Sequence, residues 1–158
     1  EDKSAVARVW DRKFLGYSFW VAPGRVVKLR VAAKALEGFR ERVRQITSRN
    51  GGRSLERVCE ELGGYLRGWR QYFTLADTPG VFGTLDQWIH RRLRTVQLKQ
   101  WKRGTTVYRE LIARGCPWQA AFGAARHARS WWSTARHGAL QTALPVAYFE
   151  RLGVPRLA

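Results

Sequence analysis

Residues 54–73 read SLERVCEELGGYLRGWRQYF and carry apolar side chains at helical spacing from Leu55 to Phe73. Ser54 precedes the first of these, and its hydroxyl is suited to accept a hydrogen bond from a free N–H of the first helical turn. Glu56 adds a negative charge in that turn, where the helix dipole favours it. The stretch therefore predicts a long amphipathic helix that starts after Ser54 and buries one side.

Glycines interrupt this helix at positions 63, 64 and 68, and each costs about 1 kcal/mol relative to alanine in a helix interior. Such a set indicates a kink or the close approach of another backbone, and we expect Gly68 to admit a neighbouring helix. Arg67 and Arg70 stand off the apolar stripe. We expect both to leave the core toward a polyanion.

Two more helices flank this one. From Ala32 to Ile46 the apolar residues again recur at helical spacing. Thr84 and Gln87 form a capping box, which predicts a third helix that starts there and ends at about Arg103.

The remaining segments predict smaller elements. Aromatic and β-branched residues around Pro23 and Gly24 predict a two-stranded hairpin between Phe14 and Val31, and an unpaired edge of it could pair two copies into a homodimer. Beyond Gly104 the pattern predicts short helices. We therefore expect a mainly α fold with these parts: a β-hairpin in residues 1–31, a three-helix bundle in 32–103, and a small helical lobe in 104–158.

Charge is the dominant feature of the composition. The chain has 29 Lys and Arg against 12 Asp and Glu, a net charge of +17, and 45% hydrophobic residues, so it should fold and carry a strongly basic surface. A polyanion is the usual partner of such a surface, and nucleic acid is the first candidate. No apolar run approaches the roughly 18 residues of a membrane span, so we expect no membrane partner. A basic protein without a polyanion partner stays an alternative.

Catalytic and metal-binding patterns are not apparent. The aspartates Asp2, Asp11, Asp77 and Asp86 are widely spaced and offer no ligand set for two-metal chemistry. Walker, nucleophile-elbow and zinc motifs do not occur, and His90 has no nucleophile near it in sequence. We expect no catalytic residue, no metal site and no cofactor in this chain.

The cysteine count and the absence of methionine bear on the cellular compartment and on whether the sequence is part of a longer protein. With only two cysteines, Cys59 and Cys116, the chain has no disulfide framework, which favours a reducing cytosol. The sequence has no Met, so we expect a piece of a longer protein.

The sequence feature that favours nucleic-acid binding is a set of cations interleaved with aromatic residues. Residues 88–103, WIHRRLRTVQLKQWKR, contain no acid. Such residues neutralise phosphates and release counterions, and aromatic or Arg planes stack on unpaired bases. Core packing is the favoured alternative for Trp69, Phe73 and Trp88 and an equal one for Trp101, whereas a solvated face is the alternative for the arginines. The predicted nucleic-acid contacts are Arg40, Arg44, Arg67, Arg70, Arg91, Arg92, Arg94, Lys99, Trp101 (as a stacking residue), Lys102, Arg103, Arg126, His127, Arg129 and Arg136.

Several segments, in this order, resemble the C-terminal part of group II intron reverse transcriptases: FLGYSFW (14–20), residues 54–73, and LDQWIHRRLRTVQLKQWKR (85–103). In that family a strand motif closes the palm, and a three-helix thumb, also called the X or maturase domain, carries a Gly-Trp-x-x-Tyr-Phe segment. Gly68, Trp69, Tyr72 and Phe73 match that segment. Matches to the helix that follows it are Leu85, Asp86, Trp88, Ile89, Arg91, Arg92, Leu93, Arg94, Trp101 and Lys102.

The resemblance extends from about Phe14 to Gly153, with departures. Gly63 and Gly64 replace the family's Asn-Pro, and His90 stands where Arg is more common. The sequence holds neither the Tyr-Ala-Asp-Asp motif that binds the polymerase's Mg²⁺ nor a Cys-rich HNH endonuclease lobe.

The resemblance implies a parent that is a bacterial, cytoplasmic RNA-directed DNA polymerase, dependent on Mg²⁺, that assists intron splicing and mobility. This chain would be its thumb and maturase portion, preceded by the end of the palm. Its implied partners are group II intron RNA, an RNA template with its DNA primer, and target DNA.

Rival interpretations stay open. The chain itself could carry the parent's polymerase activity, or the parent could be a domesticated or CRISPR-associated reverse transcriptase without an intron to splice. A third alternative is a purely structural thumb that only supports the palm.

Overall fold

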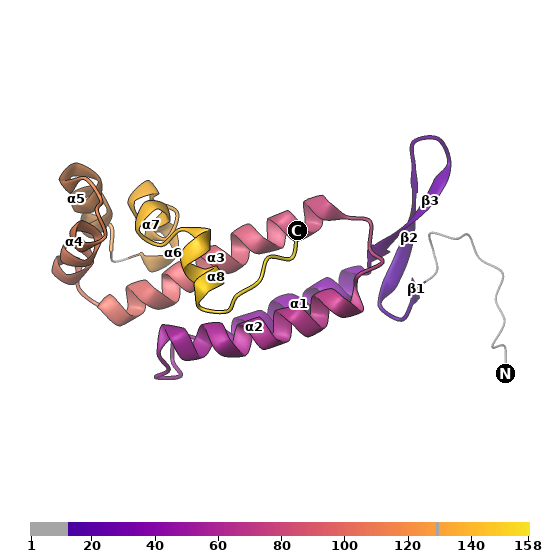
Figure 1. The fold of residues 1–158 in the computed structure, drawn as a ribbon, viewed down its shortest axis with the longest axis horizontal. Helices are drawn as coiled ribbons and strands as arrows, with labels where there is room; N and C mark the ends of the chain where they lie inside the picture. The colour runs from indigo at the N-terminus through magenta and orange to yellow at the C-terminus, as the bar shows by residue number, and fades with distance from the viewer. Residues whose placement is uncertain (1–12, 129) are drawn as a thin grey trace.

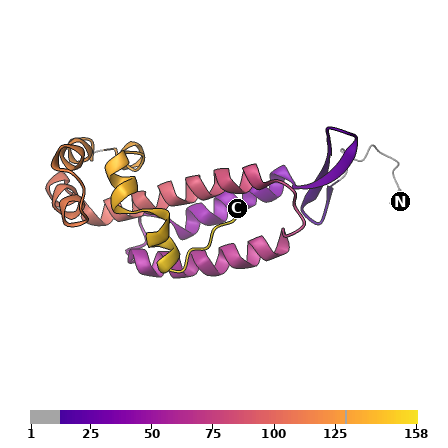
Figure 2. The ribbon, with the colours of Figure 1, turned by 45° about the horizontal axis from the view of Figure 1, so that its top comes forward.

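A computed structural model describes residues 13–128 and 130–158. Three long helices run side by side as an elongated bundle, with a small sheet at one end and short helices at the other (Figures 1 and 2). The mainly α prediction, with an N-terminal hairpin, is confirmed. In chain order the elements are β1 (Lys13–Phe14), β2 (Tyr17–Ala22), β3 (Val26–Val31), α1 (Ala33–Ile46), α2 (Leu55–Tyr72), α3 (Pro79–Trp101), α4 (Gly104–Ala113), α5 (Trp118–Arg126), α6 (Trp131–Thr134), α7 (Gly138–Ala143) and α8 (Val146–Arg151).

The sheet is antiparallel in the order β1-β2-β3, with Tyr17 opposite Val31 and Ala22 opposite Val26. The two-residue strand β1 adds to the predicted hairpin. Hydrogen bonds tie the sheet to the end of α2: the Tyr17 hydroxyl donates to the Tyr72 carbonyl at 2.6 Å, and the Tyr72 hydroxyl donates to the Leu15 carbonyl at 3.0 Å. A hairpin that is marginal alone is thereby stabilised by the bundle.

Helix α2 forms as its sequence predicts. The Ser54 hydroxyl accepts a hydrogen bond from the Arg57 N–H at 3.2 Å. The apolar stripe from Leu55 onward is buried, and the Trp69 ring packs between Phe39 and Phe73, with centroids 4.3 and 4.6 Å away. The interpretation of Trp69 and Phe73 as core residues is confirmed.

Helix α3 begins earlier than predicted. It starts at Pro79, because proline is favourable at a first helical position, where no N–H is needed. Thr84 therefore lies inside the helix and donates to the Gly80 carbonyl at 2.9 Å. The capping-box prediction at Thr84 and Gln87 was wrong. Gly104, expected to end this helix, instead begins α4 after a turn at Lys102, whose φ is 61°.

Helix α3 is the central helix. The short helices α6, α7 and α8 fold back along it (Figures 1 and 2). Every residue from 93 to 98 is buried as a result. The core is continuous from the bundle into the short helices. Among the described residues, no helix is long and apolar enough to cross a membrane.

The last residues run as an extended segment over α2 and α3 (Figure 1). Gly63 permits this, since a Cβ there would lie 2.1 Å from the Gly153 carbonyl oxygen, whereas Gly64 and Gly68 have nothing within 4 Å. The prediction that Gly68 admits a neighbour was wrong, because the close backbone comes from the tail and crosses at Gly63.

Polar groups of α2 and α3 hold this segment in place. Arg67 donates to the Gly153 carbonyl at 3.0 Å, and Arg70 donates to the Leu157 carbonyl at 2.8 Å. The Asp86 carboxylate accepts from the backbone N–H of residues 157 and 158 at 3.0–3.1 Å. We call this contact the tail seam; it consists of Gly63, Arg67, Arg70, Asp86 and residues 153–158.

Candidate nucleic-acid interface

Tryptophan rings on α3 and α6 are covered by guanidinium groups. Arg44 and Arg92 lie over the Trp88 ring, 5.8 and 5.4 Å from its centroid. Arg91 lies 3.8 Å from the centroid of the Trp132 ring. A cation over an indole face is attracted by the negative face of the ring, so each of these contacts orients a positive charge.

The same arrangement continues at Trp131. Arg49 and Lys99 lie over its ring at 5.5 and 5.3 Å. These residues join the preceding ones, because Arg49, Trp88 and Trp132 line one cavity of about 310 Å³ between α1 and α3. We call the whole set the Arg–Trp surface: Arg44, Arg49, Trp88, Arg91, Arg92, Lys99, Trp131 and Trp132.

Hydrogen bonds fix some of these cations. Arg91 donates through Nε and Nη2 to the Trp132 carbonyl at 3.0 and 2.7 Å. Arg92 donates through Nε to the Thr47 hydroxyl at 2.6 Å. Burial lowers the pKa of both arginines, and the positive charges of Arg44 and Arg49 lower that of Arg92 further. The cations repel one another, so an anion placed among them would be stabilised.

Within residues 13–128 and 130–158, no carboxylate forms an ion pair with these cations. In the described part of the chain, the ion pairs are Lys28–Asp77, Arg42–Glu61, Arg53–Glu61, Arg57–Glu60, Arg114–Glu110 and Arg156–Glu150. None of them includes a residue of the Arg–Trp surface. The acidic residues thus neutralise other parts of the molecule and leave this surface positive.

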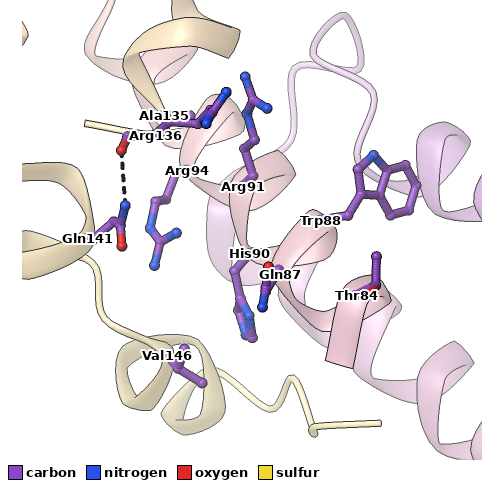
Figure 3. Close-up of a pocket in the computed structure, with 10 residues that line it drawn as sticks. All are labelled: Thr84, Gln87, Trp88, His90, Arg91, Arg94, Ala135, Arg136, Gln141 and Val146. Carbon is purple, nitrogen blue, oxygen red and sulfur yellow. Dashed lines mark hydrogen bonds between the residues drawn. The ribbon is translucent and has the colours of Figure 1, made fainter. Parts of the chain in front are cut away.

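A second cavity, of about 600 Å³, opens next to this surface between α3 and the helices that fold back on it (Figure 3). We call it the Arg94 pocket. It is lined by Thr84, Gln87, Trp88, His90, Arg91, Arg94, Ala135, Arg136, Gln141 and Val146, and this lining also contains no acid.

The predicted contact residues fall into separate groups. Arg44, Arg91, Arg92 and Lys99 come together on the Arg–Trp surface, and Arg136 lines the Arg94 pocket. Lys102, Arg103, Arg126 and His127 are exposed, and Arg40 is half-buried on α1. Arg129 lies outside the described residues.

Others face inward. Arg67 and Arg70 bind the tail, and Arg94 is 9% exposed, with its Nε donating to the Leu144 carbonyl at 3.1 Å. Trp101 is 8% exposed, and Arg114 lies 5.1 Å from its ring centroid. Its burial among α3 and α4 side chains speaks against the expectation that this ring stacks on a base.

Sequence reasoning missed Arg49, Trp131 and Trp132 as site residues and favoured the core for Trp88, which is half-buried beneath two arginines while its other contacts join the core. The adjacent tryptophans of α6 were the available signal. Adjacent helical positions point about 100° apart, so both rings cannot enter the same core.

Metal-binding chemistry finds no support in these side chains. Within residues 13–128 and 130–158, no group of three His, Cys, Asp or Glu could hold a metal ion. Both Asp86 oxygens accept backbone N–H groups of the tail. Burial, with the nearby Glu56 charge, raises the pKa of Cys59 to about 12, so this thiol stays protonated. These residues do not fit a Mg²⁺ site.

The family described as "Group II intron, maturase-specific domain" matches residues 36–115, which run from the first turn of α1 to the end of α4. The match covers half of the chain. The chain belongs to this family. The resemblance inferred from residues 54–73 and 85–103 is confirmed, since both segments lie inside the match. No curated protein matches the chain.

Proposed function

We propose that this maturase-specific domain is the RNA-binding thumb of a group II intron reverse transcriptase and that it binds intron RNA through the Arg–Trp surface. The observation that carries the proposal is the set of cations on tryptophan rings, which have no carboxylate partner among the described residues. Phosphates that replace counterions at such a surface provide salt-sensitive affinity. Trp132, which is 40% exposed, offers a plane for an unpaired base.

The family and the surface together suggest the wider setting. The parent would be an RNA-directed DNA polymerase of the bacterial cytoplasm whose Mg²⁺ sits in a palm domain. The same positive surface suits the backbone of a template–primer duplex or of target DNA, because phosphate contacts do not depend on sequence.

A purely structural role is favoured for part of the predicted set only. Arg67 and Arg70 donate to the Gly153 and Leu157 carbonyls of the tail, which stabilises the fold. If the thumb were structural throughout, removal of cations from the Arg–Trp surface would not change the salt dependence of RNA binding.

A gel-shift titration of the chain against a structured group II intron RNA tests the proposal. Between about 50 and 200 mM salt the affinity should fall steeply, as expected when many phosphates are contacted. The double variant R44Q/R49Q should reduce the log–log slope by about 2, one for each lost cation. Arg57→Gln is the matched control, because Arg57 is an exposed arginine of α2 outside this surface that pairs with Glu60. A wild-type slope near zero, or an equal loss in R57Q, would contradict the proposal.

A further inference from the structure

The Arg94 pocket has the size and chemistry of a small-ligand site. Its volume of about 600 Å³ lies within the range of about 300–1,000 Å³ that small-molecule sites occupy. Arg91 and Arg94 come from α3, and Arg136 and Gln141 come from the segments that fold back over it (Figure 3).

Arg94 is a buried cation without a carboxylate partner in the described residues. Its Nε donates to the Leu144 carbonyl, and Phe149 lies beneath the guanidinium at 6.0 Å. Removing a charge from water without a counter-ion is costly, and an anion in the pocket would offset that cost. The remaining guanidinium N–H groups match two oxygens of a phosphate.

His90 supplies a second, independent observation. The ring is 5% exposed, and its Nε2 atom is buried without a hydrogen-bond partner in the structure. It lies between Gln87 and Arg94 and points toward α8 (Figure 3). Native proteins rarely leave such an atom unpaired, and a phosphate oxygen would accept its N–H.

The acidic residues near His90 already have partners. Asp86 accepts N–H groups of the tail, and Glu150 pairs with Arg156. Neither lines the pocket. The lining therefore presents donors and positive charge without a competing anion.

We propose that the Arg94 pocket binds the phosphate ester of a single nucleotide, held by Arg94, His90 and, at the mouth, Arg91 and Arg136. Arg94 and His90 lie too deep for the backbone of a paired helix to reach, so the nucleotide must protrude from its strand or be free. Gln87 and Gln141 offer amide donors and acceptors for the sugar or base. The inference rests on the proposed function in one respect: bound RNA is one source of the nucleotide.

The test is a titration of the whole chain with 5′-AMP, inorganic phosphate and adenosine, followed by the ¹⁵N NMR signals of the His90 ring and Arg94 Nε. AMP and phosphate should shift both signals in a saturable way, and adenosine should not. Arg136→Gln should weaken AMP binding by about tenfold, the effect of one lost charge-assisted hydrogen bond. Arg57→Gln should bind AMP like the wild type. Arg136 is exposed, so its variant should fold normally.

Absence of a saturable shift with AMP and phosphate would overturn the proposal, and so would equal shifts with adenosine or unchanged affinity in R136Q. A hairpin RNA with one unpaired nucleotide, compared with its fully paired form, identifies the source: a shift with the unpaired form alone indicates an extruded nucleotide, and a shift with AMP alone indicates a free one. Failure of these signals together with an intact salt-dependent gel shift would reject the pocket and keep the proposed function. The reverse result would reject RNA binding by the Arg–Trp surface and keep the pocket.

Discussion

The tail seam and the Arg–Trp surface use arginine in different ways on nearly opposite sides of α3. Asp86 of the seam and Trp88 of the surface are two positions apart, or about 200° around a helix. In the seam, Arg67 and Arg70 donate to carbonyls of the returning chain. On the surface, Arg44 and Arg92 share a tryptophan ring and have no carboxylate partner in the part of the chain that the structure describes. An arginine on a basic helix is therefore structural or free for a ligand according to what another segment brings over it.

The largest effect should come from Gly63→Ala, which breaks the seam and leaves the surface alone. Its methyl group would meet the Gly153 carbonyl, so the tail must shift, and we expect a loss of about 3 kcal/mol in the free energy of unfolding. Urea unfolding followed by circular dichroism measures it.

Gly64→Ala is the matched control for that variant. Gly64 lies in the same helix with nothing within 4 Å, and alanine there should stabilise the protein by about 1 kcal/mol through helix propensity. Equal effects of the two variants would show that the tail does not pack at Gly63.

Asp86→Asn should weaken the seam from the α3 side. The carboxylate accepts N–H groups of Leu157 and Ala158, and an amide can offer only one acceptor oxygen, so we expect a loss of about 2 kcal/mol. Hydrogen exchange of those two amides should accelerate in the variant. Unchanged exchange would mean that the carboxylate does not hold the tail.

A comparison of single arginine variants sharpens the contrast in function. Arg49→Gln should reduce the salt slope of RNA binding by about one unit, as one phosphate contact does. Arg67→Gln should leave the slope near the wild-type value, because its guanidinium is engaged by the Gly153 carbonyl. Both are read by gel shift. A similar decrease in both would extend the RNA interface over the seam.

The smallest effect concerns pH and His90, which lies between the two regions. Burial and the charge of Arg94 lower the pKa of His90, so the unfolded chain takes up a proton near pH 6.5 where the folded chain does not. Stability should therefore decrease as the pH falls below about 6.5 and should carry no His90 contribution above it. His90→Gln should flatten this dependence in urea unfolding between about pH 6.5 and 5.5. The exposed His127→Gln serves as the control, and an equal flattening there would contradict the assignment.

Local signals predicted much of the fold. The Ser54 cap, the stripe that begins at Leu55 and the hairpin around Pro23 depend on residues close in sequence, and all were found. The start of α3 was missed because Asp77-Thr78-Pro79-Gly80 has the composition of a turn, whereas proline also suits a first helical position.

The long-range part of the site was beyond such signals. Gly63 and Gly68 look alike in sequence, and only the tail, which arrives from residue 153, decides which of them needs to be glycine. Arg67 and Arg44 likewise both stand off the apolar stripe of a helix. Only the position of the tail shows that Arg67 donates to it. Trp131 and Trp132 join α3 through a fold-back that no local pattern encodes.

The tail seam also sets an order of events during synthesis. Arg67 and Gly153 are separated by 86 residues, so at about 5–20 residues per second α2 emerges roughly 4–17 s before its partner. During that interval Arg67 and Arg70 are free to bind any polyanion near the nascent chain. Docking of the tail then engages both guanidinium groups with its carbonyls, and the Arg–Trp surface lies on the other side of α3.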